Sequence, residues 1–465
     1  MASKQSPMLR LSVVGHTNVG KTSLMRTLMR DAAFGEVAPT AATTRRVAGA
    51  RLLVAGRPLV ELYDTPGLED AGALIELLER PSAERHAGPE RIQRFLASAE
   101  ASGRFEQEAR VLDQVLQSDA ALYVIDVREP VLGKYQDELA ILALCARPIL
   151  PVLNFVAGAR ARPGEWRDAL ARVGLHAVAE FDNVVFSLES EARLWRRLAT
   201  LVDHHAAALE SLVAEREAQA RWQRKAALTM LADLLVDAAA ARRWADRGDA
   251  GALDRARRDL HAAVQARERE FARRLLELYR FDPDAHAAVP LPIDERGWQH
   301  SLFDAEILGL IGRGTGQGAA AGAAAGAAVD VATGGLSLGA GTLIGALAGG
   351  GAGAVWQLRR DLADRLRGRA VLQLDDAALT HLAARGTALI DALRQRGHAA
   401  QTPVEIARSA APPWPENRLP KTLRRTRLEP GLSTLNPDVR RDGDAREEQI
   451  RKLAEAFGTG HGLGV

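Results

Sequence analysis

The sequence predicts an α/β domain with a mostly parallel sheet, followed by an all-α region that contains a glycine-rich helical hairpin. Short β-branched runs alternate with helical stretches as far as residue 190, a pattern typical of a parallel sheet with crossover helices. Beyond that point apolar residues recur at three- and four-residue steps, as on one face of a helix. Further on, glycine recurs every four residues, a spacing that lets two helices pack closely.

Composition limits the class of protein. The chain has 465 residues, enough for roughly three domains at about 150 residues each. Its formal net charge is +2, so no overall field favours a specific nucleic acid as partner. Cys145 is the only cysteine in the sequence, which excludes an intramolecular disulfide.

Six runs are expected to form the sheet. They are LRLSVVG (9–15), ARLLVAG (50–56), PLVELYD (58–64), ALYVIDV (121–127), PILPVLNF (148–155) and NVVFSL (183–188). The second and third runs are joined so tightly that they should form an antiparallel hairpin at the sheet edge. Residues 68–119 are more than one crossover helix requires, so an insertion is expected there.

A phosphate-binding loop follows the first run. GHTNVGKTS (15–23) lies between a predicted strand and a predicted helix and fits the pattern G-x-x-x-x-G-K-[ST]. Its glycines let backbone N–H groups surround a phosphate at the positive end of the following helix. Lys21 should reach the β- and γ-phosphates, and the Thr22 hydroxyl should bind Mg²⁺. The predicted nucleotide-binding residues of this loop are Gly15, Asn18, Val19, Gly20, Lys21, Thr22 and Ser23.

A second motif, Asp64-Thr65-Pro66-Gly67, stands at the end of the third predicted strand. Asp64 can hold Mg²⁺ through a water molecule, and the Gly67 N–H can bind the γ-phosphate and so sense its loss. A lone tetrapeptide of this kind would be an ordinary turn, but this one ends a strand downstream of the phosphate loop. The two motifs together indicate a P-loop nucleotide hydrolase.

These motifs resemble those of the Era/TrmE/Der group of bacterial GTPases. The resemblance rests on GHTNVGKTSL, APTAATTRR and DTPG and covers residues 9–190. It implies GTP or GDP as the bound nucleotide, Mg²⁺ as cofactor, and Thr44, with Thr43 as the alternative, as the threonine that closes over Mg²⁺ and the γ-phosphate. It places Leu68 where Ras-like enzymes carry a water-positioning glutamine, and Asn18 where potassium-dependent members help to bind K⁺. The predicted catalytic residues are therefore Lys21, Thr44 and Gly67.

The base-recognition motifs depart from that group. Its N-K-x-D motif should follow the fifth strand, where this chain has Asn154-Phe155-Val156-Ala157. Asn154 is kept, but the lysine and the aspartate that pairs with guanine are replaced. The S-A-x signature is altered to Ser187-Leu188-Glu189, from which Ser187 is predicted to lie at the nucleotide. Either Asp182 or Glu189 could replace the missing aspartate, so guanine specificity follows from the resemblance alone.

The sequence suggests a division into five parts. They are a P-loop GTPase domain (1–190), a helical bundle (191–304), a glycine-zipper hairpin (305–358), a helical segment (359–400) and a tail rich in proline and charge (401–465). The tail is expected to be loosely ordered. Whole-chain organisation resembles uncharacterised bacterial GTPases with a C-terminal domain of unknown function.

The glycine-zipper hairpin favours contact with a membrane. Residues 314–358 contain one charge, Asp330, and the run Val331–Leu358 has 28 residues, more than the ~20 that span a bilayer. Its many glycines oppose insertion, so a hairpin buried against the other helices is the alternative. The N-terminus lacks the features of a signal peptide, which predicts a cytoplasmic chain, with peripheral or integral attachment to the inner membrane through this hairpin.

The sequence therefore predicts a GTP-binding protein that hydrolyses GTP to GDP and phosphate and couples its nucleotide state to a C-terminal helical, membrane-associated module. Its expected partners are guanine nucleotide, inner-membrane lipid or a membrane protein, and a second copy of the chain. One alternative is a ribosome- or RNA-assembly GTPase, although no KH-like helix-loop-helix follows residue 190. Others are a degenerate nucleotide-binding scaffold with little turnover and a dynamin-like membrane-remodelling protein.

Overall fold

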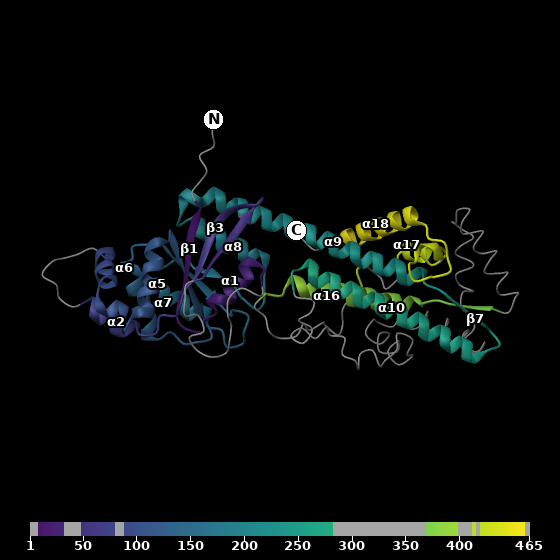
Figure 1. Ribbon diagram of the computed structural model, residues 1–465, viewed down its shortest axis with the longest axis horizontal. Coiled ribbons are helices and arrows are strands. Elements are labelled where there is room, and N and C mark those ends of the chain that lie inside the picture. The colour runs from purple at the N-terminus through teal and green to yellow at the C-terminus, as the bar shows by residue number, and fades with distance from the viewer. Residues whose placement is uncertain are drawn as a thin grey trace, which may run out of the picture. The chain divides into compact units, whose positions relative to one another are not determined.

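The computed structural model describes residues 8–31, 48–79, 88–281, 369–398, 412–414 and 419–460. The predicted switch threonines Thr43 and Thr44 and the glycine-rich residues 314–358 lie outside the described residues. The chain divides into two compact units (Figure 1): Met1–Arg221 with Arg394–Gln401, and Trp222–Leu393 with Thr402–Val465. The five-part division read from the sequence stays a prediction.

A six-stranded sheet forms the centre of the first unit. Its strands are β1 (Leu9–Val14), β2 (Ala48–Val54), β3 (Arg57–Asp64), β4 (Ala120–Asp126), β5 (Ile149–Asn154) and β6 (Ala179–Glu180), in the order β2-β3-β1-β4-β5-β6. Only β2 and β3 pair antiparallel, and the other neighbours are parallel. The predicted α/β fold and its antiparallel edge hairpin are therefore confirmed.

The sixth predicted strand was wrong. Residues 183–188 form no strand of the sheet, and β6 lies earlier, at Ala179–Glu180. The reason is a local turn, because the Asp182 carboxylate accepts hydrogen bonds from the backbone N–H groups of Val184 and Val185. Ser187 then caps the following helix, which ends the extended stretch.

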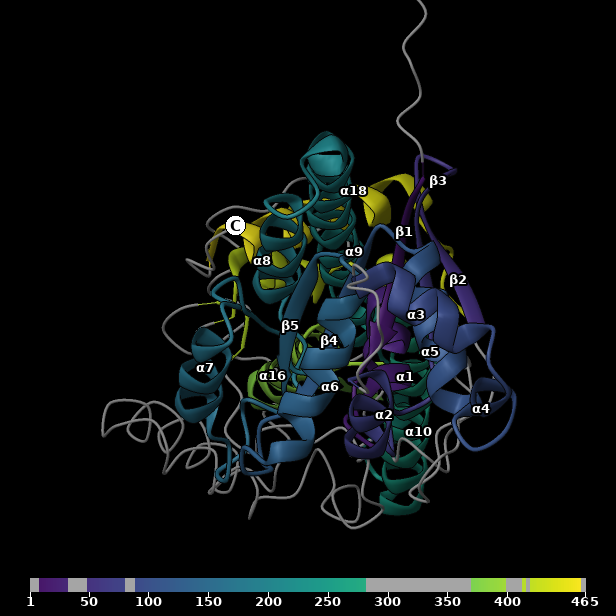
Figure 2. The same cartoon turned by 90° about the vertical axis from the view of Figure 1, so that its left-hand side faces the viewer.

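Helices cover both faces of the sheet (Figure 2). They are α1 (Lys21–Met29), α2 (Ala71–Leu78), α3 (Gly88–Leu96), α4 (Ala99–Ser102), α5 (Glu106–Gln117), α6 (Gly133–Leu144), α7 (Pro163–Arg172), α8 (Leu188–Ala199) and the 3-10 helix η1 (Asp203–His205). Alternate residues of β4 enter two different apolar cores, one shared with α1 and α8 and the other with α2 to α7. The helices α2 to α5 lie between β3 and β4, where an insertion was expected.

The second unit is mainly helical. Its elements are the C-terminal part of α9 (Ala206–Ala240), β7 (Arg243–Asp246), α10 (Ala250–Leu278), β8 (Arg369–Leu372), α16 (Asp376–Arg394), α17 (Lys421–Thr426), the 3-10 helix η3 (Pro430–Leu432) and α18 (Gly443–Gly460). A two-stranded antiparallel sheet, β7 with β8, was not predicted. Residues 419–460 also differ from the expected loose tail, because Leu423, Leu453 and Phe457 are buried in the core of this unit.

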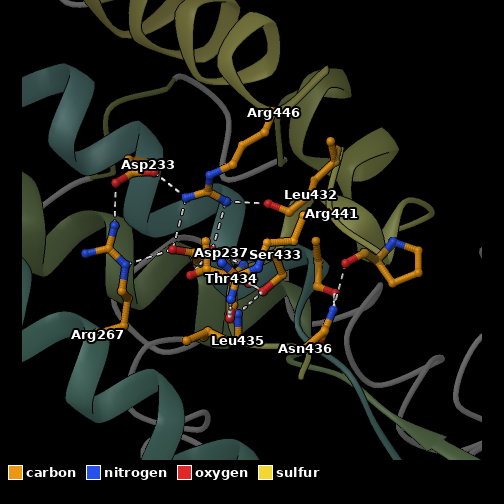
Figure 3. A network of polar contacts seen from close by, with 12 residues as sticks. Asp233, Asp237, Arg267, Leu432, Ser433, Thr434, Leu435, Asn436, Arg441 and Arg446 are labelled. Carbon is orange, nitrogen blue, oxygen red and sulfur yellow. Dashed lines mark hydrogen bonds and ion pairs between the residues drawn. The ribbon is translucent and has the colours of Figure 1, made fainter. Parts of the chain in front are cut away.

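A network of polar contacts fastens the segment 432–436 to α9 (Figure 3). The buried carboxylate of Asp237 accepts hydrogen bonds from the Thr434 backbone N–H at 2.7 Å and from its hydroxyl at 2.9 Å. The guanidinium groups of Arg267 and Arg446 bind the same carboxylate at 2.7 and 2.8 Å, and both also bind Asp233. The network joins α9, α10 and α18 through two carboxylates and two arginines.

Among the residues described, no helix has both the length and the apolar character needed to cross a bilayer. The predicted hairpin at 314–358 is not part of this set, and its membrane association stays a prediction.

Candidate functional site

The phosphate loop connects β1 to α1 and depends on glycine at two positions. Gly15 and Gly20 have φ angles of 141° and 95°, a region that side chains other than glycine rarely adopt. A Cβ on Gly15 would also lie 2.5 Å from the carbonyl oxygen of Val124. The residue that precedes α1, Gly20, makes no side-chain cap, so no side chain competes for the first N–H groups of the helix. This end of α1 suits an anion.

Lys21 is buried at the start of α1 and bends back over the loop. Its Nζ donates to the carbonyl oxygens of Gly15 at 2.9 Å and His16 at 2.8 Å. Burial lowers the pKa of Lys21 to about 8, although the nearby carboxylates of Asp64, Glu138 and Glu69 oppose this shift. A phosphate beside the ammonium group would favour its charged form and raise the pKa again.

Thr22 and Asp64 form the part of the site that fits a divalent cation. The Thr22 hydroxyl donates to Asp64 Oδ2 at 2.5 Å. Asp64 Oδ1 is buried and has no hydrogen-bond partner among the described residues, and burial raises the pKa of this carboxyl. A carboxylate oxygen left without a partner, next to a hydroxyl and a phosphate loop, matches the donors that Mg²⁺ takes from a protein when a nucleotide supplies the rest.

The segment after Asp64 lies directly on the phosphate loop. Thr65 ties it to β1, because its hydroxyl donates to the Val13 carbonyl at 2.8 Å. Gly67 packs so closely that a Cβ would lie 2.2 Å from the Thr17 hydroxyl oxygen, so only glycine fits there. Leu68 is completely buried in the core shared with α2 to α7. Its side chain is part of that core and has no polar group to hold water.

A chain of hydrogen-bonded polar side chains, which the sequence analysis did not predict, leads from the phosphate loop into the protein interior. His16 Nδ1 lies 2.8 Å from Glu138 Oε1, and the other oxygen of Glu138 accepts a hydrogen bond of 2.7 Å from the Tyr123 hydroxyl. Glu138 is fully buried on α6. Burial of Tyr123, together with the adjacent Glu138 carboxylate, raises the pKa of the Tyr123 hydroxyl. Residues so far apart in sequence carry no shared pattern that could have revealed the chain.

Two asparagines hold the other side of the loop. Asn154, predicted at the nucleotide, donates from Nδ2 to the Val19 carbonyl at 2.9 Å. Its Oδ1 accepts from the backbone N–H groups of Phe155 at 2.9 Å and Asn183 at 3.1 Å. Asn183 in turn donates to the Gly20 carbonyl at 3.0 Å. Asn183 was missed because the sequence pattern placed it at the start of a strand.

The three other residues considered for base recognition lie in different places. Asp182 joins the two loops, because its Oδ2 accepts from the Ala157 N–H at 3.1 Å while Oδ1 accepts from the segment that follows. Ser187 caps α8 by accepting from the Ser190 N–H, and Glu189 pairs with Arg193 on the exposed side of that helix. Of the three, only Asp182 lies beside residues 154–157.

Phe155 stands at the position of the lysine in the N-K-x-D motif, and its ring makes a cation–π contact with Arg128. The guanidinium carbon of Arg128 lies 3.8 Å from the ring centroid, and the same group binds both carboxylate oxygens of Asp126. The ring also approaches the phosphate loop, since a Cβ on Gly20 would meet it at 3.4 Å.

A segment from the C-terminal half completes this edge of the first unit. The Gln395 carbonyl accepts from the Phe186 N–H at 2.8 Å, and the Gly397 N–H donates to the Val184 carbonyl at 3.1 Å. A Cβ on Gly397 would lie 2.0 Å from the Asn183 carbonyl oxygen, so the two backbones are in direct contact. Residues 395–397 therefore support the loop whose Asn183 touches the phosphate loop.

Comparison with known proteins gives matches to two families. Residues 10–155 match the family described as 50S ribosome-binding GTPase, and residues 167–455 match the one described as domain of unknown function (DUF3482). No curated protein gave a significant match.

Solved structures that are similar to the chain include two structures of Era. One is Era with MgGDPNP and a segment of 16S ribosomal RNA, at 15% identity and a TM-score of 0.29, covering 38% of this chain and 51% of that one. The other is a variant of Aquifex aeolicus Era bound to GDP·AlF4⁻, at 17% identity and 0.28, covering 37% and 50%. The chain spans about half the length of each. With more than half of its residues matched, the chain belongs to the DUF3482 family, and its N-terminal part is a P-loop GTPase domain.

Proposed function

We propose that the chain binds GTP with Mg²⁺ and hydrolyses it to GDP and phosphate in the loop that joins β1 to α1. The observation that carries this proposal is the buried Asp64, whose Oδ1 is left without a partner beside the Thr22 hydroxyl and the Lys21 ammonium. In this proposal Lys21 binds the β- and γ-phosphates, and Gly67 donates its N–H to the γ-phosphate. Thr22 and Asp64 hold Mg²⁺, which offsets the phosphate charge when bound.

We also propose that K⁺ assists this hydrolysis at Asn18. Asn18 is exposed at the tip of the phosphate loop with a φ angle of 65°. Leu68 is buried and apolar, so the residue after Gly67 cannot orient water as a glutamine would. A monovalent cation beside the phosphates would supply the positive charge that an arginine provides in other GTPases.

The test is phosphate release from GTP by the full-length protein, with and without Mg²⁺, in potassium chloride and in sodium chloride of equal ionic strength. We expect turnover to require Mg²⁺ and to be several-fold faster in K⁺. Asn18→Ala should remove the advantage of K⁺ while leaving the requirement for Mg²⁺. Equal rates in the two salts would exclude the potassium proposal, and no release under any condition would exclude the hydrolase.

We further propose that the nucleotide state is coupled to the C-terminal helices through residues 395–397. The chain continues from α16 directly into this segment, and the segment supports the loop whose Asn183 binds the Gly20 carbonyl. A shift of the phosphate loop on nucleotide binding would thus be transmitted through Asn183 and residues 395–397 to the end of α16.

Gly397→Ala tests this coupling. Because the new Cβ would lie 2.0 Å from the Asn183 carbonyl oxygen, the segment must shift, and we expect a weaker affinity for GDP of roughly tenfold, or about 1.4 kcal/mol. Gly443→Ala is the matched control, since a Cβ there meets no atom within 4 Å. Titration with fluorescent GDP measures both, and an unchanged affinity in Gly397→Ala would refute the coupling.

A ribosome- or RNA-assembly GTPase is the alternative, with the same nucleotide chemistry and a different partner. Membrane association of residues 314–358 stays a proposal that rests on their sequence, and fractionation of full-length protein after a carbonate wash would decide it.

A further inference from the structure

Glu69 is the first exposed side chain after Gly67, and its carboxylate lies on the phosphate loop. Its Oε1 accepts a hydrogen bond of 2.9 Å from the Thr17 hydroxyl. Leu68 enters the core, so the chain turns its apolar side chain inward and the following carboxylate toward the phosphate loop.

Two side chains in the first turn of α5 form hydrogen bonds with the backbone on both sides of Glu69. Gln107 Nε2 donates to the Gly67 carbonyl at 2.7 Å. Glu108 Oε1 accepts from the backbone N–H groups of Glu69 at 3.2 Å and Asp70 at 3.1 Å. Three hydrogen bonds from two adjacent side chains thus bind the backbone of residues 67–70.

Glu108 has a structural reason to be a carboxylate. Only 3% of it is exposed, and a buried carboxylate is costly unless donors satisfy it. Here the donors include two backbone N–H groups, which bind an ionised oxygen more strongly than a neutral one. Its position in the first turn of α5 also favours negative charge. The inserted helix α5 therefore supports the segment that carries Glu69.

We propose that Glu69 is a catalytic residue that orients the attacking water, and that Gln107 and Glu108 are positioning residues that hold its backbone. The inference rests on the proposed hydrolysis of GTP. The water oxygen forms a bond to the γ-phosphorus while the bond from that phosphorus to the β–γ bridging oxygen breaks. GDP leaves with the electron pair, one water proton stays on the released phosphate and the other passes to solvent.

Substitution at Glu69 separates a catalytic role from a structural one. Glu69→Ala should lower kcat about 100-fold, the size of effect expected when a reacting group loses its positioning, while the affinity for GDP stays close to that of the wild type. Glu69→Gln keeps an oxygen that accepts a hydrogen bond from water, so its kcat should fall less. Glu76→Ala is the matched control, because it removes an exposed carboxylate from the neighbouring helix α2 and should leave kcat unchanged.

Gln107→Leu and Glu108→Gln test whether the hydrogen bonds between α5 and the backbone of residues 67–70 position Glu69. Gln107→Leu is nearly the same size but cannot donate to Gly67, and it should lower kcat with KM unchanged. Glu108→Gln keeps an acceptor oxygen for the two N–H groups, so it should be milder than Glu108→Ala. Thermal unfolding of each variant shows whether the fold is intact.

The outcomes are distinguishable. A wild-type protein that binds GDP but releases no phosphate would overturn both the inference and the proposed hydrolysis. A wild-type protein that turns over GTP, with a Glu69→Ala variant of equal kcat, would overturn the inference alone. So would a kcat that falls only in proportion to a lost affinity for GDP, because that pattern is the mark of a structural role.

Discussion

Lys21→Ala is expected to reduce the affinity for GDP and GTP by at least about 100-fold, or roughly 2.7 kcal/mol, while the fold stays intact. The ammonium group lies at the start of α1 and contacts only carbonyl oxygens of its own loop by hydrogen bond in the described structure, so its loss removes charge from the phosphate site. Titration with fluorescent GDP measures the effect. Lys225→Ala, which removes an exposed lysine from α9, is the control. Wild-type affinity in Lys21→Ala would mean that the phosphate site is misassigned.

The pH dependence of GDP affinity provides a second test of the contact between Lys21 and the phosphate. Burial lowers the pKa of Lys21 to about 8 in the free protein, and a bound phosphate raises it again. Free protein therefore loses this proton above pH 8 and must regain it on binding, so GDP affinity should fall as the pH rises from 7 to 9. Calorimetry in two buffers of different ionisation enthalpy should detect proton uptake near pH 8.5 and little near pH 6.5. The uptake should vanish in Lys21→Ala.

Asp237→Ala should have the largest effect on stability, a loss of about 3–5 kcal/mol in the free energy of unfolding. The substitution leaves the largely buried guanidinium groups of Arg267 and Arg446 without one of their two carboxylates and removes both hydrogen bonds from Thr434. Urea unfolding followed by circular dichroism is the measurement.

Asp254→Ala is the control for this variant. Asp254 pairs with Arg257 in solvent on α10, where an ion pair contributes little, so its loss should cost less than about 1 kcal/mol. A free energy of unfolding for Asp237→Ala as close to the wild type as that of the control would contradict the role given to the network.

The parts of the site that could be read from the sequence are those held by local backbone geometry. Gly15 and Gly20 are required by their φ angles, and Lys21 and Thr22 begin a helix at fixed positions after them. The residues that were missed act over long separations. Asn183 and Gly397 meet only in the folded chain, and neither lies in a local motif that points to the other.

The second unit shows the same limit. The helices were predicted because apolar spacing is a local signal. The pairing of β7 with β8 joins short strands on either side of a long stretch of chain, and nothing local marks it. Residues 419–460 were predicted to form a tail because they are rich in charge. In the structure, however, the Arg446 guanidinium donates hydrogen bonds to the carboxylates of Asp233 and Asp237.

The contact between Phe186 and Gln395 also bears on how the protein is made. On the ribosome Gln395 is added 209 positions after Phe186. At a rate of synthesis of about 5–20 residues per second, residues 395–397 are made roughly 10–40 s after the loop that contains Asn183. During synthesis the sheet can form well before the edge that supports the phosphate loop is in place. A fragment that ends after the first 221 residues would lack residues 394–398, which belong to the same unit. We therefore expect an excised GTPase domain to bind nucleotide more weakly than the full-length chain until residues 394–398 are added back.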